Sequence, residues 1–191
     1  LVCLSVAALI RRLRRTYTEL VTSEAQARHL ACRDSLTGLA NRAFFNTCLE
    51  RALSEVETSD EELALLFLDL DRFKQVNDTL GHAAGDALIR ELANTISAML
   101  KPGDVMARMG GDEFAILIRN VVERLEVEQL CRDIIGAVSR PFEVVGGQAV
   151  VGISIGIALA SAAQRTERSE LAREADIALY EAKRGGGQRC Q

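Results

Sequence analysis

The sequence contains few of the residues that mark unusual protein classes. It has only two prolines among 191 residues, and it shows no internal repeat and no low-complexity tract. Its five cysteines form no CxxC pair and have no spacing typical of a zinc site. An odd number of scattered cysteines predicts reduced thiols in a cytoplasmic compartment rather than a disulfide framework. With 48% hydrophobic and 26% charged residues, the chain fits one ordinary folded domain plus an appendage.

A strong overall charge is also missing. The net charge is −4 at pH 7, which argues against a general nucleic-acid-binding protein. The segment RRLRR at residues 11–15 is strongly basic, whereas the remainder of the chain is acidic on balance. We therefore expect no nucleic-acid partner, and we expect the basic segment to act locally.

No apolar run is long enough to cross a membrane, which takes roughly 20 residues. The first ten residues, LVCLSVAALI, are uncharged and are followed at once by four arginines in five positions. The chain begins with leucine, so we interpret residues 1–10 as the cytoplasmic end of a truncated transmembrane helix, with the arginines on the inner side. A buried or coiled helix end is the alternative. A signal peptide is disfavoured because its basic segment precedes its apolar one.

Residues 11–33 are predicted to form a juxtamembrane signalling helix. The segment from Leu13 to Ala31 has no glycine or proline, and Leu13, Leu20 and Ala27 recur every seven residues. This spacing favours a helix that pairs with a copy of itself, although an ordinary solvated helix explains it equally well. Asp34, Gly38 and Asn41 then interrupt the pattern, which predicts a domain over residues 34–191.

The remaining sequence alternates helical and strand patterns. Helical spacing or capping predicts helices at 43–57, 72–78, 81–100, 122–139 and 167–184. Apolar runs predict strands at 63–71, 105–108, 113–118, 142–145 and 148–159. Asp71 is expected to cap the short helix at 72–78. This order mixes crossovers with hairpins, and it predicts an α+β fold with a central, mostly antiparallel sheet covered by helices.

Two carboxylates are expected to meet at one end of this sheet. Asp69 lies near the end of a buried strand, and Asp112 follows the glycine pair Gly110 and Gly111 in a predicted hairpin. Two nearby carboxylates resist double ionisation unless a cation neutralises them, and Mg²⁺ is the natural occupant of such a site. The glycines would let a large ligand approach the backbone. The alternative is that Asp71 caps a helix and that Asp112 is an ordinary turn residue.

Six segments together resemble one known family. They are DSLTGLANR, FLDLDRFKQVND, GHAAGD, RMGGDEF, SIGIA and ADIALYEAK, and they extend over residues 33–187. In this order and at this spacing they resemble the GGDEF-domain diguanylate cyclases. The resemblance implies an enzyme that joins two GTP molecules into cyclic di-GMP and releases two pyrophosphates. It also implies a fold like the polymerase palm and the class III nucleotidyl cyclases. Together with the apolar residues 1–10 and the arginines that follow them, it predicts a full-length protein anchored in a bacterial inner membrane with its catalytic domain in the cytoplasm.

The resemblance implies roles for individual residues. Mg²⁺, which Mn²⁺ can replace, would bind Asp69, Asp112 and the backbone carbonyl of Leu70. Asn77 and Asp86 would read guanine, and His82 would contact the sugar of GTP. The phosphate end would be lined by Phe73, Lys74 and Lys183, and the turn at Gly110 and Gly111 would admit the nucleotide. Glu113 would assist the metal or take the 3′-hydroxyl proton. Singly, these residues have ordinary explanations: the lysines as solvated helix residues, Asn77 as a helix end, and Asp86 as the cap of a helix beginning at Ala87.

The resemblance also implies a dimer, because one domain would hold one GTP whereas the product contains two. Two departures from the family pattern matter. KPGD at Lys101–Asp104 stands where many members carry an inhibitory RxxD site, so we do not expect product inhibition. Gly187 stands where an arginine is common, and Arg184 or Arg189 is the candidate substitute. The alternatives are a catalytically silent GGDEF domain that binds GTP or dimerises, and a cyclase with relaxed base choice.

Overall fold

The structure is a computed structural model that describes residues 32–59, 61–163 and 166–191. The predicted membrane segment at 1–10 and nearly all of the predicted helix at 11–33 lie outside the described residues. Among the helices that the structure describes, none has the length and the apolar character needed to span a bilayer.

The centre of the fold is a five-stranded sheet with the order β1-β3-β4-β2-β7. The strands are β1 (Ala40–Asn41), β3 (Val105–Gly110), β4 (Glu113–Val121), β2 (Glu62–Asp71) and β7 (Gly152–Ser161). Only β1 and β3 pair in parallel, and the other three pairings are antiparallel. The predicted α+β fold with a mostly antiparallel sheet is therefore confirmed.

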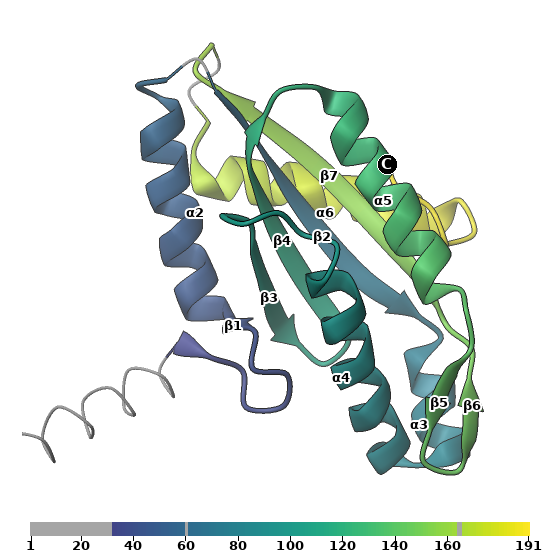
Figure 1. Cartoon of the computed structure of the whole chain (residues 1–191). Coiled ribbons are helices and arrows are strands. Elements are labelled where there is room, and N and C mark those ends of the chain that lie inside the picture. The colour runs from purple at the N-terminus through teal and green to yellow at the C-terminus, as the bar shows by residue number, and fades with distance from the viewer. Residues whose placement is uncertain (1–31, 60, 164–165) are drawn as a thin grey trace, which may run out of the picture.

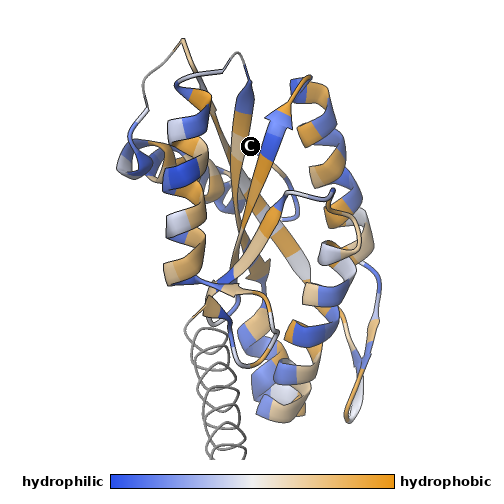
Figure 2. Ribbon diagram, turned by 60° about the vertical axis from the view of Figure 1, so that its left-hand side comes forward, coloured by the Kyte–Doolittle hydropathy of each residue, from blue (hydrophilic) through white to orange (hydrophobic). Residues whose placement is uncertain are grey.

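Helices cover both faces of this sheet (Figure 1). Helices α4 (His82–Ser97) and α5 (Arg124–Val138) pack on one face, and α2 (Arg42–Val56) and α6 (Arg168–Arg184) pack on the other. The short helix α3 (Phe73–Leu80) follows the end of β2 and packs against α4. Figure 2 shows the strands mainly in hydrophobic colours and the helices in mixed colours, as expected for a sheet buried between two helical layers.

Successive residues of β2 point to opposite faces, as the pleat of a strand requires. Leu66 and Leu68 belong to the core beneath α4 and α5, whereas Leu63 and Leu65 belong to the core beneath α2 and α6. The first core is the larger one, and it is completed by apolar residues of β4 and β7. The same alternation assigns Asp69 to the face covered by α2 and α6, which decides the partners of its carboxylate.

Two predicted elements differ in the structure. The strand expected at 148–159 is divided: β6 (Gly147–Ala149) pairs with β5 (Phe142–Val144) in a separate two-stranded sheet, and β7 begins only at Gly152. Val150 and Val151 lie between the two strands, and because both are apolar the sequence pattern gives no sign that the strand is divided here. The predicted cap of α3 is also wrong. Its N-cap residue is Arg72, whose backbone is left-handed (φ 66°, ψ 17°), and no side chain caps the helix.

Asp71 does not cap α3 because its carboxylate is used elsewhere. Asp71 is the last residue of β2, and its Oδ1 accepts a hydrogen bond of 2.9 Å from the buried hydroxyl of Ser154. Its Oδ2 accepts a hydrogen bond of 2.9 Å from the backbone N–H of Gln188. The carboxylate therefore ties the C-terminal tail to the strand end and is unavailable to the helix.

Candidate active site

The ends of β2 and β4 bring the predicted metal ligands together. Asp69 lies opposite Glu113 in the antiparallel register of these two strands. The backbone N–H of Leu70 also donates a hydrogen bond of 3.4 Å to the carbonyl of Asp112. Asp69, Leu70, Asp112 and Glu113 therefore share one end of the sheet, as predicted from the adjacent hairpin.

The carboxylate of Asp69 is the most enclosed acidic group of this site. Its side chain is 14% exposed, and its Oδ2 lies 2.7 Å from Nζ of Lys183 on α6. Burial raises the pKa of Asp69, the ammonium of Lys183 opposes that rise, and the charges of Asp112 and Glu113 add to it, so that the pKa stands above its ordinary value. The site thus holds more negative charge than Lys183 offsets.

The donor set fits a small hard cation. Two carboxylates on neighbouring strand ends, with the nearby carbonyl of Leu70, are oxygen ligands of the kind that Mg²⁺ uses. Among the described residues, no group of three or more histidine, cysteine, aspartate or glutamate side chains lies close enough to hold a metal. Two carboxylates and one carbonyl would leave coordination positions for water or phosphate, several of which Mg²⁺ usually keeps.

The backbone conformation of the β3–β4 turn explains why residues 110 and 111 are glycines. Gly110 and Gly111 have φ values of 148° and 54°, in the region where residues with a Cβ are disfavoured. A Cβ built on either glycine meets no heavy atom within 4 Å. The turn between β3 and β4 therefore requires glycine for its conformation, and its outer side is open to a ligand.

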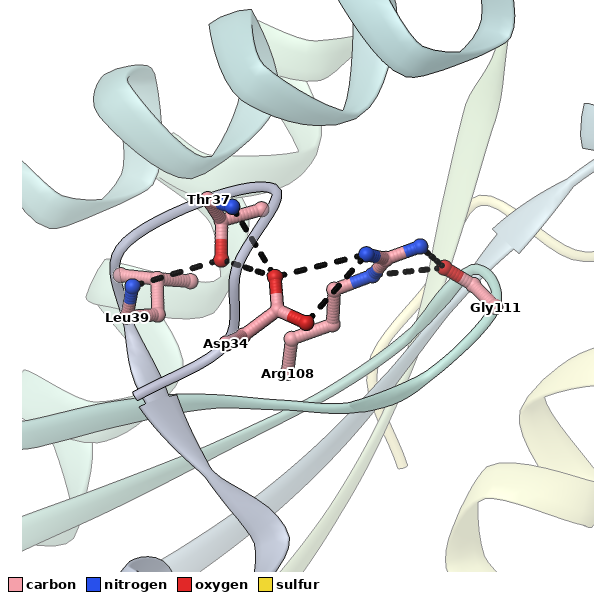
Figure 3. A network of polar contacts seen from close by, with 5 residues as sticks. All are labelled: Asp34, Thr37, Leu39, Arg108 and Gly111. Carbon is pink, nitrogen blue, oxygen red and sulfur yellow. Dashed lines mark hydrogen bonds and ion pairs between the residues drawn. The ribbon is translucent and has the colours of Figure 1, made fainter. Parts of the chain in front are cut away.

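Two arginines that the sequence did not single out hold this hairpin. Arg108 on β3 donates from Nε and Nη2 to the carbonyl of Gly111, at 3.0 and 2.8 Å. Its Nη1 also contacts both carboxylate oxygens of Asp34, at 3.3 and 3.4 Å (Figure 3). Arg42 on α2 donates from Nε to the carbonyl of Met109 at 3.1 Å and lies 3.8 Å from the carboxylate of Glu113. Both flanks of the glycine turn are thus fixed by guanidinium groups.

Helices α3 and α4 carry Asn77 and Asp86, which are expected to read the base, and Phe73, which is expected at the phosphate end. The side chains of Asn77 and Phe73 lie against Gly85, so closely that a Cβ at Gly85 would overlap the Asn77 carboxamide and lie 3.2 Å from the Phe73 ring. Asp86 is the next residue of α4 and is exposed. Because α4 begins at His82, Asp86 lies inside the helix and does not cap it. A glycine in the first turns of a helix was the overlooked signal of this close packing.

The lysines expected at the phosphate end have different environments. Lys74 is exposed on α3, whereas Lys183 is bound to Asp69 at the C-terminal end of α6. Of the two candidate arginines, Arg184 stacks on Tyr180 at 5.8 Å and pairs with Glu181 at 3.8 Å. The guanidinium of Arg189 instead packs against Gly185, so closely that a Cβ on Gly185 would overlap the guanidinium.

The KPGD turn lies apart from this site, between α4 and β3. Asp104 accepts hydrogen bonds from the backbone N–H groups of Lys101 and Arg119, at 2.9 and 3.3 Å. Nζ of Lys101 lies 2.8 Å from the carboxylate of Glu126 on α5. Both charged groups of the turn are therefore already engaged with groups of this chain.

Comparisons with known proteins agree with the fold. The family model described as the diguanylate cyclase GGDEF domain matches residues 31–189. The chain is 40% identical over 178 residues to diguanylate cyclase TpbB of Pseudomonas aeruginosa, which is 93% of this chain and 41% of that protein. It is 44% identical over 163 residues to probable diguanylate cyclase DgcE of Escherichia coli, which is 84% of this chain and 14% of that protein. The chain thus spans less than half the length of these relatives.

A solved structure is similar over nearly its whole length. It is the crystal structure of the coiled coil and GGDEF domain of DgcB from Caulobacter crescentus in complex with c-di-GMP. The TM-score is 0.89 at 32% sequence identity, and the match covers 97% of each chain. The family model, the sequence identities and this shared fold lead to one conclusion: the chain belongs to the GGDEF family of diguanylate cyclase domains.

Proposed function

We propose that this chain condenses two GTP molecules into cyclic di-GMP and releases two pyrophosphates. The observation that carries the proposal is the pair of carboxylates formed by Asp69, near the end of β2, and Asp112, in the adjacent turn between β3 and β4, with Lys183 bound to Asp69 at 2.7 Å. A carboxylate pair with an adjacent ammonium suits a metal-bound triphosphate, because the cations offset the phosphate charge.

Each residue of the site then has a role toward GTP. Asp69, Asp112 and the carbonyl of Leu70 would hold Mg²⁺ or Mn²⁺, which when bound polarises the phosphate oxygens and offsets charge on the leaving pyrophosphate. Asn77 would pair with both a donor and an acceptor of guanine, and Asp86 would accept from its N–H groups. Phe73, Lys74 and Lys183 would line the phosphates, His82 would contact the sugar, and the open turn at Gly110 and Gly111 would admit the nucleotide.

The reaction needs two copies of the domain. Each copy would bind one GTP and present its 3′-hydroxyl to the α-phosphate of the other. A phosphate ester bond forms, the bond to pyrophosphate breaks, and Glu113 would accept the hydroxyl proton. Glu113 suits this step because its side chain is 57% exposed and its ion pair with Arg42 is long, at 3.8 Å. Turnover would therefore depend on dimerisation.

The setting of the domain is also part of the proposal. The apolar residues 1–10 and the arginines at 11–15 would anchor the full-length protein in a bacterial inner membrane, with the catalytic domain in the cytoplasm. The segment 11–33, which the sequence predicts to be a helix, would set the relative position of two copies. Inhibition by cyclic di-GMP at the KPGD turn is not expected, because Lys101 lacks the bidentate fork of arginine.

One observation favours a second candidate, a silent GGDEF domain that binds GTP or dimerises. Lys183 already neutralises part of the charge of Asp69, so a metal must compete with an ammonium for this carboxylate. The retention of Asp69, Asn77, Asp86, Asp112 and Glu113 argues against this candidate. A cyclase with relaxed base choice is disfavoured by Asp86, since adenine offers an acceptor where guanine offers a donor.

One experiment separates these functions. The purified protein is incubated with labelled GTP and Mg²⁺, with and without ATP, and the products are separated. We expect cyclic di-GMP in both reactions, and we expect Asp112→Asn to reduce its formation by at least about 100-fold. Asp133→Asn is the matched control, because the exposed Asp133 on α5 accepts a hydrogen bond from Gln129 and has no ion pair within residues 32–59, 61–163 and 166–191. Hydrolysis of GTP alone, or binding without a product, would contradict the proposal.

A further inference from the structure

A cavity of about 580 Å³ lies where the start of α3 meets the C-terminal end of α6. Two of its lining residues are cationic: Arg72 at the start of α3 and Lys183 near the end of α6. The remaining lining residues are Asp71, Gly186, Gly187 and Gln188. Asp71 is the one acidic residue among the lining residues, and its two carboxylate oxygens accept hydrogen bonds from Ser154 and Gln188.

Arg72 differs from Lys183 in having no counter-ion. The ammonium of Lys183 is bound to Asp69, whereas the guanidinium of Arg72 has no ion pair or side-chain hydrogen bond with any residue in the described part of the chain. Its backbone is left-handed, with φ 66°, which is uncommon for a residue with a long side chain. A disfavoured conformation next to an unpaired charge is typical of a functional position.

The turn after α6 contributes backbone of Gly186 and Gly187 to the lining of the cavity. Gly186 and Gly187 have φ values of 109° and 72°, and a Cβ at Gly187 would lie 2.8 Å from Oδ2 of Asp71. The hydrogen bond from Gln188 to Asp71 fixes the end of this turn. A cavity whose wall is already ordered binds a ligand with little further loss of conformational entropy.

We propose that Arg72 binds the β- and γ-phosphates of a nucleoside triphosphate in this cavity, together with Lys183. Its fork of N–H donors matches two phosphate oxygens, whereas Lys183 acts as a point charge. Arg72 thereby makes the site selective for triphosphates over monophosphates. This inference rests on the proposed GTP site. It assigns the polyphosphate contact to Arg72 and not to Arg184, which is engaged with Tyr180 and Glu181.

The test compares ligands that differ only in phosphate number. Calorimetric titrations with a non-hydrolysable β,γ-imido analogue of GTP, inorganic tripolyphosphate and GMP are made on wild type and variants. We expect Arg72→Gln to weaken binding of the analogue and of tripolyphosphate about tenfold and to leave GMP binding unchanged, since one charge-assisted hydrogen-bond pair is lost. Arg184→Gln, which removes the same charge from a neighbouring exposed position, should leave all three affinities unchanged.

A second variant guards against a folding defect. Arg72→Gly removes the side chain and suits the left-handed backbone, so it should retain the fold and still lose triphosphate affinity. Arg72→Lys should restore part of that affinity. Equal losses for GMP and the triphosphate analogue, or unchanged affinities in Arg72→Gln and Arg72→Gly, would overturn the assignment.

The two proposals fail in different ways. If the wild type forms no cyclic di-GMP but Arg72→Gln still loses triphosphate binding, the cyclase proposal fails and the role of Arg72 stands. If the wild type forms cyclic di-GMP and Arg72→Gln binds the triphosphate analogue normally, only the role of Arg72 is refuted.

Discussion

Arg108 and Asp34 form an ion pair, with Nη1 and Oδ1 3.3 Å apart, although 74 residues separate them in the sequence. Both side chains are largely enclosed, at 16% and 21% exposure. The same guanidinium donates two hydrogen bonds to the carbonyl of Gly111 (Figure 3). The guanidinium of Arg108 therefore connects the loop that follows the predicted signalling helix to the turn that precedes Asp112.

The first prediction concerns this ion pair and pH. Burial alone would raise the pKa of Asp34, but hydrogen bonds from Thr37 and the charge of Arg108 together lower this pKa below its ordinary value. A lowered folded-state pKa stabilises the fold above the unfolded-state value, and this contribution is lost as the pH falls through the folded-state pKa. Asp34→Asn should therefore reduce the free energy of unfolding by about 1 kcal/mol at pH 7, a value limited by solvent screening.

Urea unfolding at several pH values measures this effect. The difference between Asp34→Asn and wild type should shrink as the pH falls through the lowered folded-state pKa of Asp34, because the wild-type carboxylate then becomes protonated. Asp133→Asn on α5 serves as the control, because its partner is the neutral Gln129. A difference that stays constant down to the lowest pH at which the fold persists would refute the role of the Asp34 charge.

The second prediction concerns Gly85 on α4. A methyl group at this position would overlap the carboxamide of Asn77 and press on the ring of Phe73. Gly85→Ala should therefore displace Asn77 and weaken GTP binding about tenfold. The fold should be kept, because the obstructing atoms belong to the ends of side chains that can rotate. Titration with the β,γ-imido analogue of GTP, together with thermal unfolding, measures both effects.

Gly136 on α5 provides the matched control for Gly85. It is also a helical glycine, but a Cβ there meets no atom within 4 Å. Gly136→Ala should leave nucleotide affinity unchanged and stabilise the fold by about 0.5–1 kcal/mol. Unchanged nucleotide affinity in Gly85→Ala would show that Asn77 does not need this close approach.

The sequence predicted the features that depend on local pattern. The apolar run that ends at Asp69 predicted β2, and the glycines before Asp112 predicted the hairpin. From these two elements the sequence predicted that the two carboxylates lie at the same end of the sheet. Local pattern also misled: Asp71 has the right position to cap α3, but Ser154 and Gln188 occupy its carboxylate. Both of these partners come from distant parts of the chain.

The contacts missed from the sequence share one property. Both contacts join segments that are far apart in the sequence: Arg108 pairs with Asp34, and Arg42 donates to the carbonyl of Met109 in the hairpin. Neither arginine is distinguished by its neighbours, because charged residues at strand and helix ends are ordinary. Only the position of Gly85 inside a helix carried a detectable signal, since glycine there costs about 1 kcal/mol relative to alanine.

The third prediction concerns binding of the reaction product. Lys101 is already paired with Glu126, and the carboxylate of Asp104 accepts two backbone hydrogen bonds. The nucleotide-free protein should therefore bind cyclic di-GMP at the KPGD turn more weakly than about 10 µM, since a lysine cannot form a bidentate contact with a phosphate. Lys101→Arg should tighten this binding about tenfold. Calorimetric titration of the product measures both values.

The affinity for the GTP analogue is the control for Lys101→Arg, because the turn lies apart from the Asp69 site. This affinity should be the same in variant and wild type. Submicromolar binding of cyclic di-GMP by the wild type, lost when Asp104 is changed to Ala, would refute the prediction and would identify the turn as an inhibitory site.

The last prediction links the packing of α6 to the position of Lys183. A Cβ at Gly156 on β7 would overlap the backbone of Ala175 and Leu179, which cannot move unless the whole helix shifts. Gly156→Ala should therefore reduce the free energy of unfolding by about 2–3 kcal/mol and also weaken triphosphate binding, because Lys183 lies on the displaced helix. Ile155→Val changes the opposite face of the same strand and should lose about 1 kcal/mol without changing nucleotide affinity. If both variants lose stability but bind the GTP analogue like the wild type, the close approach of α6 to Gly156 does not position Lys183.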